Sequence, residues 1–145
     1  MKPNRSGFTL LELVIVLFLI TLMLGLSSVF FANTLPSGRF NATAREIAAT
    51  LRQAKHRAQR SGKQQIVTIN MDTKSYGIDG LTGKTLPSGI SIKVIDPLSG
   101  EHTGGSYPIA FQTTGSTEGG KVVLWNNDKT AQIQVDPVAG AVVIR

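Results

Sequence analysis

The first quarter of the chain carries a nearly unbroken run of apolar residues. From Phe8 to Phe31 the only ionisable side chain is Glu12, and no proline interrupts the run. At about 1.5 Å per residue, a helix of this length spans the roughly 30 Å hydrocarbon layer of a bilayer. A helix also satisfies its backbone groups internally, as lipid requires. The run therefore predicts a membrane-spanning helix.

From Arg39 to Ser61 the pattern becomes amphipathic, because apolar residues recur every three or four positions. The stripe consists of Phe40, Ala44, Ile47, Ala48, Leu51, Ala54 and Ala58. Its small side chains favour close packing against a sheet. Gly62 stands where a helix C-cap is expected, and Arg57 and Arg60 suit the negative end of the helix dipole.

Between these two segments the chain reads Leu35-Pro36-Ser37-Gly38. Pro36 has no N–H to donate and restricts Leu35, while Gly38 adds backbone freedom. We therefore expect a kink or a short break, and we divide the chain into a leader at 1–7, a membrane and assembly helix at 8–35 and a domain at 36–145.

Beyond Gly62 the pattern changes to short β-rich runs separated by turn residues, which predicts strands. We expect them at 65–70, 75–79, 89–95, 109–112, 121–126, 131–135 and 141–144. Short runs joined by turns favour an antiparallel sheet, and the turns at 126–129 and 136–140 predict that the last three runs form a meander. The Gly- and Ser-rich segments 98–106 and 113–120 predict mobile loops. The fold class is α+β, with a helix at 39–61 packed on a sheet at 65–145.

Composition narrows the chemistry. Among 145 residues there is no cysteine, which excludes disulfides, thiol catalysis and Cys-ligated metals. The net charge of +6 is uneven: residues 1–63 carry nine Lys and Arg against two acids, and residues 64–145 carry six against seven. The basic character therefore belongs to the leader and the amphipathic helix.

Glu12 is the unusual residue of the apolar run. Insertion scales place the cost of a charge at a helix centre at about 2.5–3.5 kcal/mol. Near the helix end, a protonated acid or one reaching the interface is one explanation, and a functional acid is the other. Lys2 and Arg5 predict a cytoplasmic amino terminus and a domain on the far side. Cleavage after Gly7 would create an amine at Phe8, and a staggered neighbouring subunit could present that amine to Glu12.

The residues Gly7-Phe8-Thr9-Leu10-Leu11-Glu12 resemble the signal of type IV prepilins and type II secretion pseudopilins. The shared features are a short basic leader, a glycine, an aromatic residue, and a glutamate five residues into the mature chain. The resemblance implies a pilin-like fold, cleavage after Gly7 by a prepilin peptidase, N-methylation of Phe8 and a role for Glu12 in registering subunits. It also implies a bacterial inner membrane, a periplasmic domain and other pilin-like subunits as partners.

A second, less specific resemblance covers residues 44–70. The pattern ARxxAxxLRxAxxRAxRSG followed by a strand is similar to the minor pseudopilin H family of type II secretion. That family also includes minor pilins of type IV pili, some of which bind DNA. The resemblance implies a structural subunit that primes or caps a filament, with a minor pilin of a type IV pilus as the alternative.

Three other interpretations remain open. A secretory signal peptide needs a small-x-small cleavage site, but Phe30 stands where a small residue is needed before Ala32. DNA binding would use basic residues of the amphipathic helix and its end, namely Arg39, Arg45, Arg52, Lys55, Arg57, Arg60 and Lys63. Without interleaved aromatic residues, a solvated helix face is the simpler explanation. A membrane-anchored module that binds a ligand on its sheet would draw attention to Trp125, although a lone Trp in a strand is usually part of the core.

Motifs for catalysis are missing. His56 and His102 each stand without a second ligand at metal spacing. The segment 79–83 lacks the alternating oxygen ligands of a calcium loop, so an ordinary turn is expected there. We expect no cofactor and no enzyme activity; the chain would be the substrate of a peptidase and a methyltransferase.

Overall fold

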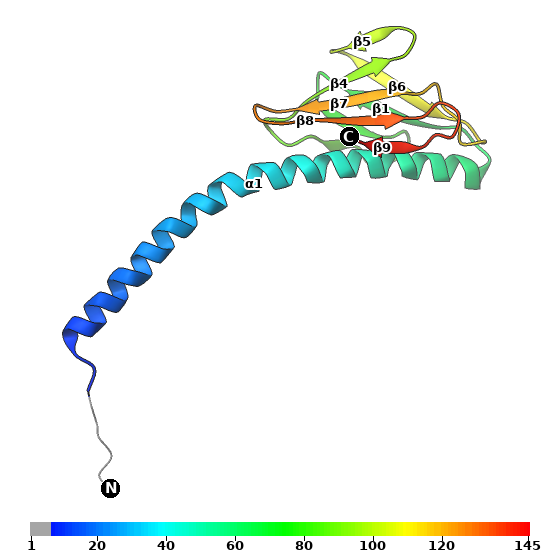
Figure 1. Cartoon of the computed structure of the whole chain (residues 1–145). Helices are drawn as coiled ribbons and strands as arrows, with labels where there is room; N and C mark the ends of the chain where they lie inside the picture. The colour runs from blue at the N-terminus through cyan, green and yellow to red at the C-terminus, as the bar shows by residue number, and fades with distance from the viewer. Residues whose placement is uncertain (1–6) are drawn as a thin grey trace. The chain divides into compact units, whose positions relative to one another are not determined.

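The computed structural model describes residues 7–145, and for residues 28–37 it describes the backbone alone. The chain divides into two compact units, with the boundary between Gly38 and Arg39. One helix, α1, runs through this boundary, and all the described strands belong to the second unit (Figure 1).

Helix α1 extends over Leu10–Ser61, 52 residues. Gly62 follows with a φ of 62°, so the predicted C-cap is confirmed. Of the kink or short break expected at Pro36, the break is wrong, because the helical backbone is continuous through it. A proline inside a helix removes one hydrogen bond and costs about 3 kcal/mol, and more than twenty helical residues on each side outweigh that loss.

The first sheet has the strand order β3-β2-β1-β6, with every pair antiparallel. Its strands are β1 Gln65–Asn70, β2 Ser75–Ile78, β3 Lys84–Thr85 and β6 Ser106–Phe111. The hairpin of β1 and β2 is the one expected from the sequence. Pro108 lies in β6 at the edge of the sheet, where its missing N–H interrupts no ladder.

The second sheet has the order β5-β4-β7-β8-β9, again antiparallel throughout. Its strands are β4 Ser91–Asp96, β5 Gly100–His102, β7 Gly120–Trp125, β8 Thr130–Val135 and β9 Val142–Ile144. The last three strands form the predicted meander. The alternating burial of β8, with Ala131, Ile133 and Val135 buried, matches the alternation read from its sequence.

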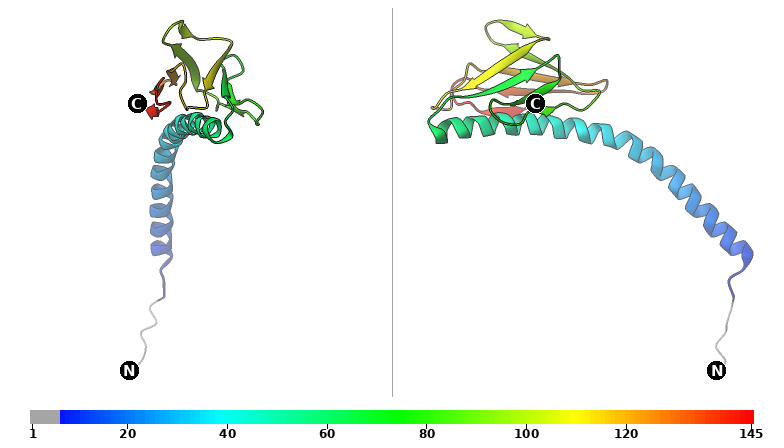
Figure 2. Two further views of the ribbon diagram at one scale, coloured as in Figure 1. Left: turned by 90° about the vertical axis from the view of Figure 1, so that its right-hand side faces the viewer. Right: turned by 180° about the vertical axis from the view of Figure 1, so that it is seen from behind.

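The core lies between α1 and the two sheets (Figure 2). All seven residues of the predicted apolar stripe are at most 3 % exposed, so the packing expected for residues 39–61 is confirmed. The sheets contribute mainly β-branched and aromatic side chains to the same cluster, among them Val67, Ile69, Phe111 and Ile133. Small alanines on the helix let the sheets approach closely, which is why a stripe with four alanines can fill this core.

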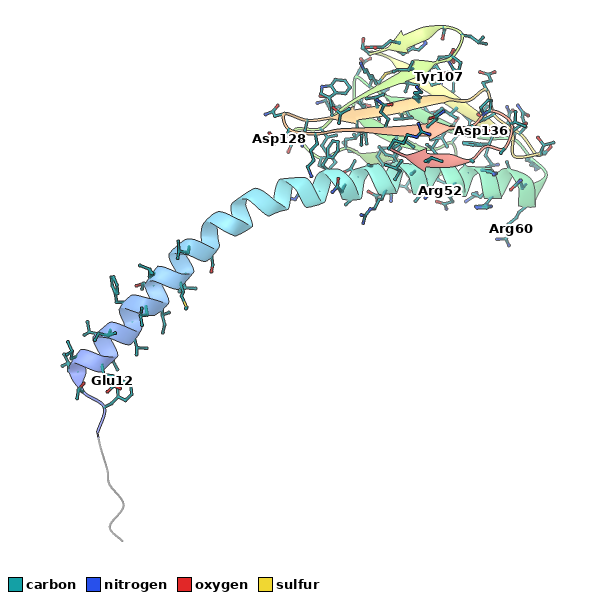
Figure 3. All side chains as sticks on the ribbon, in the orientation of Figure 1. Glu12, Arg52, Arg60, Tyr107, Asp128 and Asp136 are labelled. Carbon is teal, nitrogen blue, oxygen red and sulfur yellow. The ribbon has the colours of Figure 1, made fainter. Side chains whose placement is uncertain are left out.

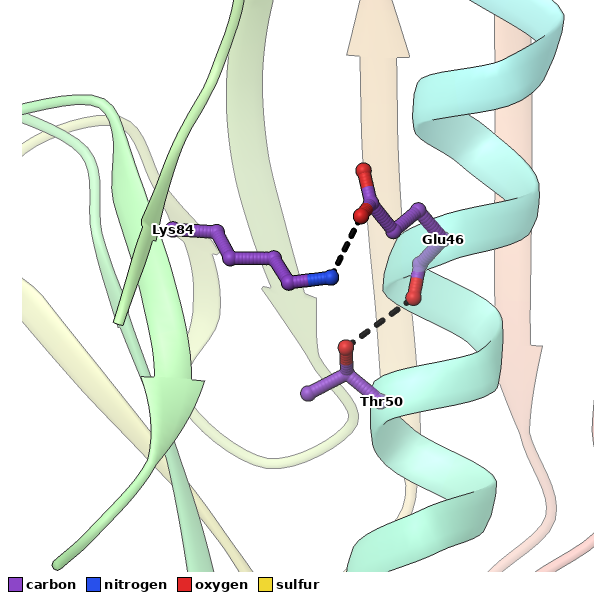
Figure 4. A network of polar contacts seen from close by, with 3 residues as sticks. All are labelled: Glu46, Thr50 and Lys84. Carbon is purple, nitrogen blue, oxygen red and sulfur yellow. Dashed lines mark hydrogen bonds and ion pairs between the residues drawn. The ribbon is translucent and has the colours of Figure 1, made fainter. Parts of the chain in front are cut away.

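Within the second unit, polar side chains fasten both flanks of the helix to the strands and loops packed against it. On one flank Arg52 Nη2 donates to the Val142 carbonyl at 2.8 Å, Lys55 Nζ to that of Ala139 at 2.6 Å and Gln59 Nε2 to that of Thr114 at 3.3 Å. On the other flank Lys84 donates to Glu46 Oε1, and the Thr50 hydroxyl donates to the Glu46 carbonyl at 3.0 Å (Figure 4). These bonds fix which face of the helix remains free.

Three features of the sheets differ from expectation. There are two sheets where one was expected. The segment 98–106, expected as a mobile loop, contains β5, which forms a short hairpin with β4 because Asp96 and Gly100 can close a tight turn. The two-residue strand β3 was not expected, because so short a run has no alternation.

Candidate functional site

The predicted processing segment lies just ahead of the helix. Gly7, Phe8 and Thr9 are exposed and have no regular secondary structure, and the helix begins at Leu10. Thr9 acts as the N-cap: its hydroxyl accepts the Glu12 N–H at 3.2 Å and its carbonyl accepts the Leu13 N–H at 3.2 Å. The peptide bond between Gly7 and Phe8 therefore lies outside the helix.

Glu12 occupies the first turn of α1, where the positive end of the helix dipole favours a carboxylate. Thr9 and Glu12 have the spacing of a capping box, Thr-x-x-Glu. The side chain of Glu12 is exposed, and neither ion pair found in the described part of the chain involves it. Its carboxylate is thus available to a cation on another molecule (Figure 3).

The apolar run that follows has no protein partner within the described chain. The 18 residues Leu10–Ser27 are long and apolar enough to cross a membrane, and 0 % of them are buried. Their large side chains stand out on every side of the helix; Leu10 is 82 % exposed and Met23 is 69 % exposed. Such a surface needs lipid or other apolar helices around it.

The basic residues singled out in the sequence are only partly brought together. Arg52, Arg57 and Arg60 line one shallow hollow, largely open to solvent, with Ala49 and His56 on the face of α1 that points away from the sheets. We call this surface the basic face; Gln53 completes its lining, and Arg45 lies about two turns earlier on the same side of the helix. Arg52 is partly committed to the fold through its bond to Val142.

Lys63 does not belong to the basic face. It follows the end of α1, and its backbone N–H is bonded to the Ser61 hydroxyl at 3.3 Å. Arg39, at the start of the globular unit, and Lys55, tied to Ala139, also lie apart from the hollow.

A polar cluster that the sequence analysis missed joins the two sheets. Tyr107 on β6 donates its hydroxyl hydrogen bond to Asp96 Oδ2 at the end of β4. Asp96 Oδ1 accepts the N–H groups of Leu98 at 2.7 Å and Ser99 at 2.6 Å. His102, expected to stand alone, is bonded to the Ser99 hydroxyl at 2.8 Å and packs against the Tyr107 ring at 5.1 Å.

These contacts set the electrostatics of the junction. The hydrogen bond from Tyr107, then those from the backbone of Ser99 and Leu98, hold the pKa of the Asp96 carboxyl well below its usual range. Burial, followed by the bond to Asp96, raises the pKa of Tyr107. The cluster has no third group aligned on His102 that would make Ser99 a nucleophile, so its role within the described residues is to hold the hairpin of β4 and β5 on the first sheet.

Other candidates from the sequence have structural explanations. Asp79 accepts the Thr68 hydroxyl at 2.7 Å, and no group of three metal-ligating side chains occurs within the described residues. Trp125 is half-buried on the outer side of β7, with Lys93 Nζ 5.6 Å from its ring, so the expectation of a core Trp is wrong. Side chains 121 and 125 share a strand face that points away from α1, which is why Trp125 stays outside the core.

The comparisons agree with the resemblance read from the sequence. Residues 2–28 match the family described as the prokaryotic N-terminal methylation motif. A structure of the minor pseudopilin EpsH from the type 2 secretion system of Vibrio cholerae matches with a TM-score of 0.58 at 15 % identity, over 74 % of this chain and 96 % of that chain. A second structure of EpsH matches with a TM-score of 0.60 at 13 % identity, over 74 % and 93 %.

The chain has the fold of a minor pseudopilin. At these sequence identities the likeness is one of fold alone. The family match adds that the amino-terminal residues carry a methylation motif. No curated protein matches the sequence. The predicted α+β, pilin-like fold class is confirmed, and residues Leu10–Ser27 of its first helix are long and apolar enough to cross a membrane.

Proposed function

We propose that this chain is a minor pseudopilin, a structural subunit of the filament that drives type II protein secretion. In this proposal a prepilin peptidase cuts after Gly7 at the cytoplasmic face of the inner membrane and the new amino group of Phe8 is methylated. The globular unit lies in the periplasm, the chain binds no cofactor, and it performs no catalysis of its own. The observation that carries the proposal is the pairing of a methylation motif with a pseudopilin fold in one chain.

The mechanism is mechanical. The subunit rests in the membrane through its apolar helix and is then extracted into a bundle where the helices of other subunits replace lipid. Glu12 lowers the cost of extraction by pairing with the Phe8 amine of an adjacent subunit, since two desolvated opposite charges attract strongly at low dielectric. The free carboxylate of Glu12 and the exposed apolar side chains of residues 10–27 support this assignment.

Mass spectrometry of the protein from its native host tests the processing. We expect a mature chain that begins at Phe8 and carries one methyl group. An intact Met1, or a start well beyond residue 8, would overturn the proposal.

The role of Glu12 is tested by Glu12→Gln. Glutamine is the alternative to glutamate in a capping box, so the helix start is retained while the charge is removed. We expect normal membrane insertion and several-fold less incorporation into filaments, measured by co-purification with other pilin-like subunits. Glu46→Gln on the same helix is the matched control and should assemble normally; equal assembly of both variants would refute the pairing.

A second candidate is a minor pilin of a type IV pilus that takes part in DNA uptake. The observation that favours it is the basic face, where Arg57 and Arg60 are exposed next to one another. A gel-shift series with the compact unit 39–145 would show binding that weakens steeply with salt, and Arg57→Glu should reduce it. Absence of salt-sensitive binding at low salt removes this candidate. Crosslinking to the other subunits of the host filament distinguishes a secretion pseudopilus from a type IV pilus.

A further inference from the structure

β9 is the last strand of the second sheet, so one of its two edges has no neighbouring strand. On its paired side, Gln132 and Arg145 exchange two backbone hydrogen bonds of 2.8 Å. Hydrogen-bonded and non-hydrogen-bonded pairs alternate along an antiparallel ladder. Val142 and Ile144 therefore belong to non-hydrogen-bonded pairs with β8, and their N–H and C=O groups point to the free side of the strand.

Three of these four outward backbone groups have no partner within the described part of the chain. The Val142 carbonyl accepts Arg52 Nη2 at 2.8 Å, whereas the Val142 N–H, the Ile144 N–H and the Ile144 carbonyl are not bonded. Such an edge is a template for a further strand. Two of the other edges are protected, because Pro108 in β6 has no N–H and β3 is only two residues long.

Basic side chains of α1 lie beside the free edge of β9 (Figure 3). Lys55 is bonded to the Ala139 carbonyl and Arg52 to that of Val142, so β9 runs antiparallel to this part of the helix. Arg45 lies seven residues before Arg52, on the same side of the helix and about 10 Å along its axis. Three strand residues beyond Val142 span a similar distance. We call Arg45, Arg52 and Lys55 the basic flank.

The arginines of the basic flank have no carboxylate partner in the described chain. Neither of the ion pairs found there involves Arg45 or Arg52. Glu46 is the one acid in the sequence 39–61, and it is paired with Lys84 on the other flank of the helix. At the far end of the edge, Asp136 Oδ1 already accepts two backbone N–H groups of its own turn, at 3.0 and 2.7 Å. Carboxylates placed beside β9 would therefore meet unpaired guanidinium groups.

We propose that an extended, acidic segment of a partner protein adds to the second sheet as one further strand on the free edge of β9. Its backbone bonds the outward groups of Val142 and Ile144, and its carboxylates, on the face turned to α1, pair with Arg45 and Arg52. Arg52 has a role in both states. In the empty site it guards the edge by occupying the Val142 carbonyl. On binding it leaves this carbonyl for a carboxylate, to which a guanidinium bonds more strongly.

The charge of the basic flank disfavours a second copy of this chain as the occupant. Pairing two β9 edges about a two-fold axis would bring the same basic flank of both copies together, with the exposed Arg145 at the end of each strand. Juxtaposed like charges oppose such a contact, whereas an acidic segment is attracted. The site goes beyond the proposed function, since it depends neither on cleavage after Gly7 nor on the secretion machine.

Hydrogen exchange in the full-length chain, held in detergent micelles, tests the strand addition. The probe is an acetylated octapeptide of alternating glutamate and valine. In the free protein the amides of Val142 and Ile144 should exchange faster than that of Val143, which is bonded to β8. The peptide should slow the first two several-fold and leave Val143 unchanged. An octapeptide of alternating lysine and valine is the matched control and should slow neither; a protected Ile144 amide in the free protein, or equal effects of both peptides, would overturn the proposal.

Ile144→Pro tests the backbone contact. Proline removes the outward N–H at this position, which takes no part in the ladder with β8. Ile144→Ala is the matched control, because it shortens the same side chain and keeps the N–H. The proline variant should lose binding of the fluorescently labelled acidic peptide, and the alanine variant should bind it almost as the original chain does. Thermal midpoints report whether both variants fold. Equal binding by two folded variants would refute the added strand.

Charge reversal tests the ionic part of the contact. Arg45→Glu should weaken binding of the acidic peptide several-fold. Lys121→Glu makes the same change of net charge at an exposed position on the face of β7 that points away from α1, and it should leave the binding almost unchanged. Equal weakening by the two reversals would contradict a pairing with Arg45.

The remaining outcomes separate this site from a second copy and from the proposed function. Self-association that Ile144→Pro abolishes, in a chain that binds no acidic peptide, would overturn the partner segment in favour of a second copy. A chain that is cleaved after Gly7 and methylated but binds no peptide loses this site and keeps the proposed function. Specific peptide binding by a chain that keeps its leader has the opposite meaning.

Discussion

The two halves of α1 share one backbone conformation but differ in what surrounds their apolar side chains. Residues 10–27 are predominantly apolar and none of them is buried, whereas residues 40–58 carry a narrow apolar stripe that is at most 3 % exposed. The second half is completed by the chain's own sheets. The first half needs partners from outside the chain, in the form of lipid or other helices. One continuous helix thus has apolar side chains that need lipid or other chains in its first half, and apolar side chains packed on the chain's own sheets in its second half.

Substituting one glycine in each half of the chain should give the largest difference in stability between the two regions. A Cβ on Gly140 would lie 2.0 Å from the Gly115 carbonyl oxygen, at a positive φ, whereas a Cβ on Gly25 would meet nothing within 4 Å. We expect Gly140→Ala to lower the free energy of unfolding by about 4 kcal/mol or more, an effect typical of severe strain. Gly25→Ala should leave the globular unit unchanged, and thermal denaturation of both variants measures the difference.

Leucine truncation on the same helix gives the next largest effect. Leu51 is fully buried and Leu17 is 54 % exposed. Leu51→Ala should destabilise the globular unit by about 3 kcal/mol through lost burial and a cavity. Leu17→Ala should leave its unfolding transition within about 0.5 kcal/mol of the original value. Equal losses for both variants would mean that the first half also packs on the sheets.

Acid should act on the globular unit through the sheet junction. The folded-state pKa of Asp96 is depressed by Tyr107, Ser99 and Leu98, so its contribution is fully present above the ordinary Asp pKa near 4 and is lost as the pH falls below it. We expect the thermal midpoint to fall from about pH 4 downward. In Tyr107→Phe this acid-dependent part of the decline should be smaller, because the strongest contact to the carboxylate is missing. An unchanged profile would place the acid sensitivity elsewhere.

The ion pair of Glu46 on α1 gives the smallest stability effect. Glu46 is paired with Lys84, and their side chains are 49 % and 53 % exposed. Such a pair contributes about 0.2–1 kcal/mol, so Glu46→Gln should shift the unfolding midpoint slightly and less still in high salt. A loss well above that range would show that the pair fastens the helix to β3 more strongly than its exposure implies.

The sequence predicted which segments form helices and strands better than it predicted which strands pair with one another. The 3–4 spacing from Phe40 to Ala58 located the amphipathic helix and its buried face, and β1 was placed at its observed limits, Gln65–Asn70. The division into two sheets was not predictable from local patterns, because they carry no information about which distant strands pair. β6 pairs with β1 across some 40 residues, while β4 pairs with β7 in the other sheet. The continuity of α1 through Pro36 was missed because a local penalty was weighed without the length of helix on either side.

The roles assigned to Gly7, Phe8 and Glu12 stay predictions, while the methylation motif itself matches over residues 2–28. The motif at Gly7–Glu12 was identifiable from residue types alone, since lipid makes a single acid conspicuous. The junction of Asp96 and Tyr107 was not, because the two residues lie on different sheets.

The N-cap at Thr9 has a consequence for the proposed removal of the leader. A peptidase that accepts extended substrates would not have to unwind a turn to reach the bond after Gly7, because the helix is already terminated by the Thr9 hydroxyl. Trimming there would leave the first turn and its hydrogen bonds as they are. The cut would then change the charge at the tip of the rod without changing its length or its register in the membrane.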